Sequence, residues 1–270
     1  MKYLEKSLRL LAKNYVILLP FLVATALPGI IERGDVLVPG FVKVLELFKN
    51  PGEVRVVPYV LLMMKDLILS QSTGFLGFIF KFAAIPATIG MIIKVTNGLD
   101  AAVDDIIPSI SRYFKQYLLY WAGTLALGFL AGMFVLLAGL LIAAVTALIS
   151  GFKLFFLVCL FFGLLVITVV LSVFLCFWFP AMAVDNLNLL DAAKKSFETA
   201  QKSFLLVIGV FTLVNIIGGL IQLLLSVIVG WIPILGSLTV SIAPTVTTVL
   251  LYMFYVVVYR SKTGRDTEHN

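Results

Sequence analysis

Among the polar residues inside long apolar stretches of the sequence, five are candidates to act on a ligand. These candidate cavity residues are Lys81, Asn215, Gln222, Thr245 and Thr248. Lys81 is the only charged residue within the segments that we expect to cross a bilayer, and an ionisable side chain at that depth indicates a functional site. In a cavity, its ammonium would bind an anionic lipid or amphiphile.

Each of these residues also has a plainer interpretation. The four-carbon stem of Lys81 would let its ammonium reach the membrane surface, where the residue would serve only as an anchor. The threonines could hydrogen-bond to the backbone of their own helix, which is ordinary helix packing. The sequence leaves both interpretations open.

The residue sets that enzymes use are not found in the sequence. The single histidine, His269, lies in the polar tail, so no Ser-His-Asp set can form, and no His, Cys, Asp or Glu group has metal-ligand spacing. The acidic residues Asp100, Asp104 and Asp105 are interpreted as a solvated helix face. We therefore expect a protein that is not an enzyme, needs no cofactor or metal, and has no nucleic-acid partner.

The elements that must position the candidate residues are membrane-spanning helices. The chain has 270 residues, of which 61% are hydrophobic and 13% are charged, whereas a soluble protein would have about 25% charged residues. Residues 117–152, 154–184 and 203–259 contain no charge, and each run exceeds the ~20 residues that cross a bilayer. We predict an all-α polytopic membrane protein with six transmembrane helices, at residues 14–31, 74–93, 117–148, 154–179, 204–229 and 238–259.

Glycines mark the predicted contacts between these helices. Gly128 and Gly132 are four residues apart on the third span, and Gly218 and Gly219 are adjacent on the fifth. Small residues let two helix backbones approach closely within a membrane. We predict helix packing at these four positions, and a ligand groove is the alternative.

An amphipathic segment precedes the last pair of spans. In residues 188–204, Leu190, Ala193, Phe197, Ala200 and Phe204 recur at helical spacing, and most charged residues lie off that stripe. This pattern predicts a helix in the membrane interface with its Ala/Phe face turned inward. An acidic residue three positions after Asn188 also predicts a helix cap there.

Similar segments precede the other two pairs of spans. Asn97-Gly98-Leu99-Asp100-Ala101-Ala102 matches Asn188-Leu189-Leu190-Asp191-Ala192-Ala193, and the N-terminal Lys6-Ser7-Leu8 matches Lys195-Ser196-Phe197. In the middle copy, Pro108 should break the helix. We predict a single membrane domain, 1–270, of three helix hairpins with pseudo-threefold repetition, as units 1–96, 97–187 and 188–260, followed by a polar tail, 261–270. Alternatively, any surface helix of this kind would give the similarity.

A family resemblance rests on the end of the fourth span and the segment after it. The residues are Phe179-Pro180-Ala181, Asp191-Ala192-Ala193, Lys194-Lys195-Ser196-Phe197 and Lys202-Ser203-Phe204. This pattern resembles the membrane region that precedes the catalytic domain of some bacterial glycerophosphodiester phosphodiesterases, and related stand-alone six-span membrane proteins of unknown function. The resemblance implies a six-span fold. We expect no catalytic domain here, so the phosphodiesterase activity does not carry over.

Positive residues are unevenly distributed between the connections. Residues 1–14 carry four, and 94–116, 181–204 and 260–270 carry three each, whereas the two short connections on the other side carry only Lys153. Because lysine and arginine favour the cytoplasmic side, we predict a prokaryotic plasma (inner) membrane protein with both termini in the cytoplasm. Signal-peptide cleavage after Ala24-Thr25-Ala26 is a competing interpretation, which the long amphipathic segment before it disfavours.

Two functions fit these features. The first is lipid or small-amphiphile handling, or transport, with a cavity between the helix hairpins. The alternative is a membrane scaffold or assembly factor that binds partner proteins or organises lipids through its cytoplasmic helices. Membrane lipids are partners in both cases, and a homo-oligomer is compatible with both.

Reporter fusions test the predicted topology. Fusions at residues 151 and 234 should report an outside location, and a fusion at residue 270 an inside location, because the positively charged connections stay in the cytoplasm. A cytoplasmic signal at residue 151 would overturn the topology.

Overall fold

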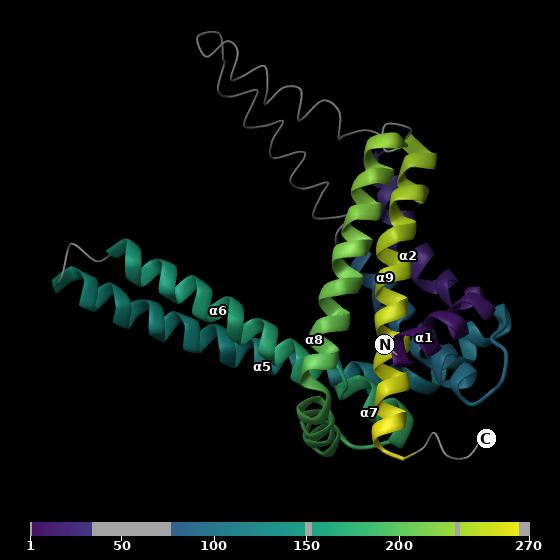
Figure 1. Ribbon diagram of the computed structural model, residues 1–270, viewed down its shortest axis with the longest axis horizontal. Helices are drawn as coiled ribbons and strands as arrows, with labels where there is room; N and C mark the ends of the chain where they lie inside the picture. The colour runs from purple at the N-terminus through teal and green to yellow at the C-terminus, as the bar shows by residue number, and fades with distance from the viewer. Residues whose placement is uncertain (1, 34–76, 149–152, 230–232, 265–270) are drawn as a thin grey trace, which may run out of the picture. The chain divides into compact units, whose positions relative to one another are not determined.

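A computed structural model describes residues 2–33, 77–148, 153–229 and 233–264. Within these ranges all regular structure is helical, and no residue lies in a strand (Figure 1). The elements are α1 (Lys2–Lys13), the 3-10 helix η1 (Tyr15–Leu18), α2 (Leu19–Arg33), a helix Gly77–Thr96, the 3-10 turn η2 (Val103–Asp105), α5 (Ile106–Leu148), α6 (Lys153–Leu175), α7 (Trp178–Asp185), α8 (Leu189–Ile228) and α9 (Pro233–Lys262). The predicted all-α class is confirmed for these residues.

Five of the described helices are long and apolar enough to cross a membrane, and the number rises to six if α1 and Tyr15–Pro28 form one bent span. Length and composition therefore agree with a multi-span membrane protein. The exact number of six spans and the threefold repeat stay predictions. The long loop after the first span, the turn at 150–151, most of the hairpin at 230–233, and residues 265–270 of the tail, which include His269, lie outside the described residues.

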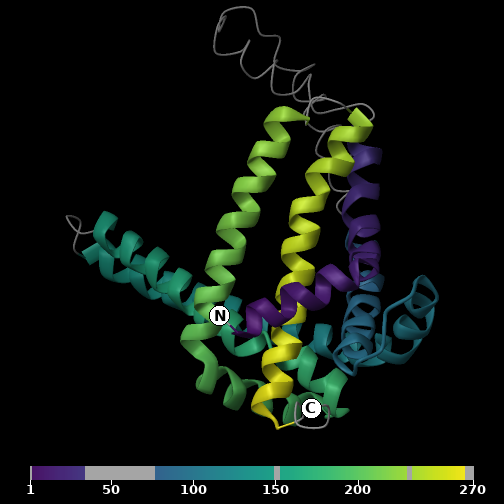
Figure 2. The same cartoon turned by 45° about the vertical axis from the view of Figure 1, so that its right-hand side comes forward.

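A sharp corner separates α1 from the first predicted span. The helix axis turns by 93° between α1 and the Tyr15–Pro28 segment, and Figure 2 shows α1 lying across the direction of α2. Asn14 forms the corner, where its amide side chain donates a hydrogen bond to the Leu10 carbonyl oxygen at 3.2 Å. If α2 crosses the bilayer, α1 therefore lies along the membrane surface, as a basic amphipathic helix should.

The first part of α8 buries a different face from the one that we predicted. Leu190 is 78% exposed and Phe197 is 53% exposed, whereas Ser196 and Ala200 are fully buried. Phe197 nevertheless stacks on Phe174 at a ring-centroid distance of 4.1 Å. The prediction was therefore wrong for Leu190 and right for Ala200. The reason is close approach: the Ser196 hydroxyl donates to the Phe174 carbonyl oxygen at 2.5 Å, which a large side chain on that face would prevent.

The two matching Asn-x-x-Asp stretches have different structures. Asn188 caps α8 as predicted, since its Oδ1 accepts a hydrogen bond from the Asp191 amide at 2.9 Å. The Asn97–Asp100 stretch instead forms a loop, and η2 and α5 begin after it. Pro108 gives the reason: it occupies the first turn of α5, and an earlier helix start would set its ring against the carbonyl of residue 104.

The chain forms two compact units, whose boundaries differ from those of the three repeat-like segments. The first comprises Met1–Ile110 and Phe211–Met253, and the second Ser111–Val210 and Phe254–Asn270. In the first unit, the Thr25 and Thr245 hydroxyls are hydrogen-bonded at 2.9 Å and join α2 to α9.

The second unit is centred on aromatic residues of α7. Phe177, Trp178 and Phe179 are all buried. The Tyr120 ring meets the edge of Trp178 at a centroid distance of 5.6 Å. At the end of α9, the Tyr259 hydroxyl donates to the Asp185 carboxylate at 2.6 Å. The tyrosine therefore brings the polar end of α7 and the last turns of α9 together.

Of the four glycines predicted at helix contacts, Gly218 lies against another helix. A Cβ atom added to Gly218 would collide with the Thr247 side chain of α9, whereas one added to Gly219, Gly128 or Gly132 would have no heavy atom within 4 Å. Figure 1 shows α8 and α9 side by side over this part of the first unit. Gly218 therefore allows the close approach of these two helices.

The two adjacent glycines of α8 give a matched test. We expect Gly218→Leu to lower the free energy of unfolding by about 1–3 kcal/mol, because the new side chain has to displace Thr247. Gly219→Leu should not lower it, because the space beside Gly219 is open. Thermal unfolding of both variants in detergent micelles measures the difference. Equal losses would show that α8 and α9 do not meet at Gly218.

Candidate functional site: an apolar groove beside a polar clamp

An apolar hollow of about 190 Å³ lies within the first unit. We call it the groove. Its lining residues come from the η1–α2 segment, the Gly77–Thr96 helix and the start of α5, and all of them are apolar: Leu19, Pro20, Val23, Ala24, Phe80, Ala83, Ala84, Ala87, Ile106 and Ile110. The groove therefore offers space for an apolar group and no polar side chain to meet it.

Small residues at helical spacing leave this space open. Ala83, Ala84 and Ala87 share one face of the Gly77–Thr96 helix, because residues three and four apart lie together. The same spacing brings Ile106 and Ile110 of α5 to the groove. Packing of three alanines against larger side chains leaves the hollow between the helices.

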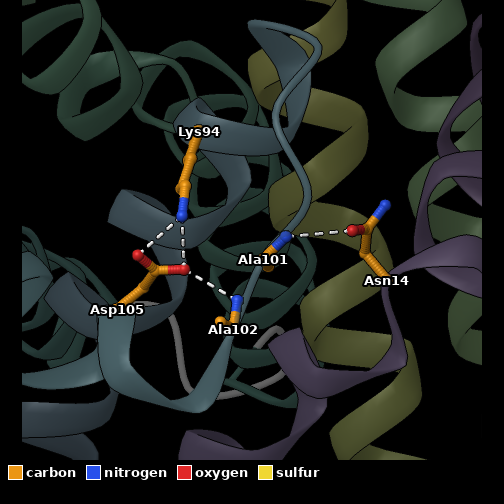
Figure 3. A network of polar contacts seen from close by, with 5 residues as sticks. All are labelled: Asn14, Lys94, Ala101, Ala102 and Asp105. Carbon is orange, nitrogen blue, oxygen red and sulfur yellow. Dashed lines mark hydrogen bonds and ion pairs between the residues drawn. The ribbon is translucent and has the colours of Figure 1, made fainter.

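Polar contacts join residues next to the groove-lining segments: the end of the Gly77–Thr96 helix, the turn η2 before α5, and the corner at Asn14 (Figure 3). The Lys94 ammonium contacts both carboxylate oxygens of Asp105, at 2.7 and 2.8 Å. Asp105 also accepts a hydrogen bond from the Ala102 amide at 2.7 Å. The end of the Gly77–Thr96 helix is thereby fixed to the start of α5.

A second contact adds the corner after α1. The Ala101 amide donates to Oδ1 of Asn14 at 3.1 Å, and next to it the Lys13 ammonium pairs with Asp100 at 2.9 Å. We call Asn14, Lys94, Ala101, Ala102 and Asp105 the polar clamp. Because the clamp joins the elements that wall the groove, it holds the groove walls together.

The Lys94–Asp105 pair is the shielded part of this network. Their side chains are 34% and 23% exposed, whereas those of Lys13 and Asp100 are 70% and 71% exposed. The Lys94 ammonium, and after it the Ala102 amide, hold the pKa of the Asp105 carboxyl below its ordinary value. Asp105 therefore stays ionised at neutral pH and keeps both contacts.

The prediction of a solvated helix face was wrong for Asp105. The local signal is only partial: an acidic residue three positions after Ala102 can accept a hydrogen bond from its amide, as in a capping box, but Ala102 lacks the side-chain oxygen that makes this pattern recognisable. The pairing of Asp105 with Lys94 depends on how the loop folds back, which no local pattern reports.

The structure does not gather the five predicted cavity residues at one site. Lys81 is exposed and is not among the groove residues. Asn215 and Gln222 are exposed on α8, where the Asn215 amide donates to the Phe211 carbonyl oxygen at 2.7 Å. Thr245 is buried and bonds to Thr25, and Thr248 is half-buried. Their polar atoms therefore do not converge on the groove.

Among the described residues, no group of three or more His, Cys, Asp or Glu side chains could hold a metal ion. No family model, no curated protein and no solved structure matches this chain. The resemblance to the membrane region of glycerophosphodiester phosphodiesterases therefore rests on the short pattern around residues 179–204 alone.

Neighbouring acidic residues allow a matched test of the clamp. We expect Asp105→Asn to lower the free energy of unfolding by about 1–2 kcal/mol. This is the lower part of the range for hydrogen bonds to charged groups, because water still reaches the Asp105 side chain and screens its charge. Asp104→Asn should change it little, because Asp104 is exposed. Unfolding in detergent micelles at neutral pH measures both.

The pH dependence provides a second readout. A carboxyl whose pKa is lower in the folded than in the unfolded state stabilises the fold at pH values above its unfolded-state pKa. This contribution is lost as the pH falls through the folded-state pKa. The stability difference between the wild type and Asp105→Asn should therefore shrink on acidification below about pH 4. A difference that persists unchanged at pH 2 would contradict the ionic role of Asp105.

Proposed function

We propose that this chain is a non-enzymatic integral membrane protein that binds lipids or small amphiphiles by taking part of an apolar chain into the groove. The observation that supports the proposal is the lining, which is entirely apolar in a protein rich in span-length helices. Within a bilayer, acyl chains are the surrounding solvent, so they are the apolar groups that reach such a hollow.

The size of the groove favours part of a ligand over a whole one. Pockets that enclose drug-sized molecules have volumes of about 300–1,000 Å³, and the groove has about 190 Å³. A section of an acyl chain would fit in it, with the rest of the lipid outside. The groove thus suits binding or presentation of a membrane lipid better than complete enclosure.

The groove belongs to the cytoplasmic half of the proposed topology. Leu19 and Pro20 line it, and they follow directly on α1, whose four positive residues are predicted to stay in the cytoplasm. The lipid would therefore come from the cytoplasmic leaflet of a prokaryotic plasma membrane. The polar clamp would hold the groove walls in place while chains exchange.

Filling the groove tests this proposal. In Ala83→Phe the new ring would occupy the hollow, and we expect native mass spectrometry of the detergent-purified protein with dioleoyl phosphatidylcholine to retain at least one lipid fewer per chain than the wild type. Ile79→Phe is the matched control, because Ile79 is an exposed residue of the same helix and does not line the groove.

Both variants should keep the helix content and elution volume of the wild type. A lower number of bound lipids then cannot result from unfolding. If Ala83→Phe retains as many lipids as Ile79→Phe and the wild type, the groove is a packing defect and not a binding site.

A further inference from the structure

We propose that the basic face of α1 binds the anionic headgroup of the lipid whose chain enters the groove. This inference rests on the proposed function and adds the lipid class. It makes α1 and the groove two parts of one site, one for charge and one for the apolar chain.

Four positive side chains form a narrow stripe on α1. At about 100° per residue, Lys2, Lys6, Arg9 and Lys13 fall within an arc of roughly 60°, along about 16 Å of helix. All four are exposed, whereas Ser7 and Leu11 on the opposite side are buried. The helix therefore packs on the protein with one face and presents positive charge with the other.

The stripe ends six residues before the first residue of the groove. Lys13 is followed by the corner at Asn14 and then by Leu19 and Pro20, which line the groove. The 93° turn at this corner leaves α1 along the membrane surface if α2 crosses the bilayer. A lipid whose chain lies between α2 and the Gly77–Thr96 helix would thus have its headgroup at the level of α1.

Lys13 can exchange its present partner for a phosphate. Its pair with Asp100 is about 70% exposed on both sides, and exposed pairs of this kind contribute little to stability. Lys94 differs, because Asp105 contacts it with both oxygens and is shielded. Headgroup binding would therefore engage Lys13 while the clamp stays closed.

Charge and location favour a lipid over a free anion. On α1, Glu5 is the one acidic residue, and it pairs with Arg9 at 3.2 Å, so the helix keeps a net positive charge. Clusters of basic residues on an amphipathic helix attract anionic lipids at a membrane surface. Inorganic phosphate is also an anion but has no chain for the groove, so it should bind far more weakly.

Competition between two lipids tests the inference on the full chain. Purified protein is offered equal amounts of dioleoyl phosphatidylglycerol and dioleoyl phosphatidylcholine, and native mass spectrometry gives the ratio bound. We expect the wild type to bind more phosphatidylglycerol than phosphatidylcholine. In the triple variant Lys6→Gln/Arg9→Gln/Lys13→Gln, the bound ratio of the two lipids should fall about tenfold or more, because each basic residue near an anionic surface contributes roughly fivefold.

Two further variants make the test specific. Lys194→Gln/Lys195→Gln/Lys202→Gln removes the same number of charges from α8 and should keep the preference. Asp100→Asn should keep or raise it, because Lys13 loses its competing carboxylate. Added inorganic phosphate at millimolar concentration should not displace the lipid.

The outcomes separate this inference from the proposed function. If Ala83→Phe loses lipid but the α1 variant keeps the wild-type preference, the groove binds chains and α1 does not select the headgroup. An equal loss in the α8 variant, or a fall in preference on Asp100→Asn, would likewise overturn the assignment to α1. Displacement by inorganic phosphate would show a free-anion site instead.

Discussion

The ion pair between Lys94 and Asp105 holds together the part of the structure that carries the candidate site. Lys94 lies in the last turn of the Gly77–Thr96 helix, and Asp105 precedes α5, so the pair closes the loop between two helices. Asp105 also accepts the hydrogen bond of the Ala102 amide, and the next residue, Ile106, lines the groove opposite the alanines of the neighbouring helix.

The helices themselves could be predicted because their cause is local. Long uncharged runs form helices of span length, and the corner at Asn14 separates α1 from the first apolar segment. The cap at Asn188 also follows from residue types alone. The face that the first part of α8 buries did not follow, because the close contact of Ser196 with the Phe174 backbone leaves Leu190 of the hydrophobic stripe exposed.

The candidate site was harder to foresee, because its parts are ordinary residues. Alanine, proline and isoleucine carry no chemical signal, and the groove exists only through the way in which three separate segments meet. Intramembrane polar residues attracted attention instead, yet Thr245 serves a helix contact with Thr25, and Lys81 does not line the groove.

The central claim is that an apolar chain occupies the space between α2 and the Gly77–Thr96 helix. Electron cryo-microscopy of the protein in lipid nanodiscs containing phosphatidylglycerol tests it most directly. The account predicts continuous density for an acyl chain against Ala83, Ala84 and Ala87, ending in a headgroup near Lys13. A groove filled by other side chains of the protein, with no lipid density along it, would contradict the account.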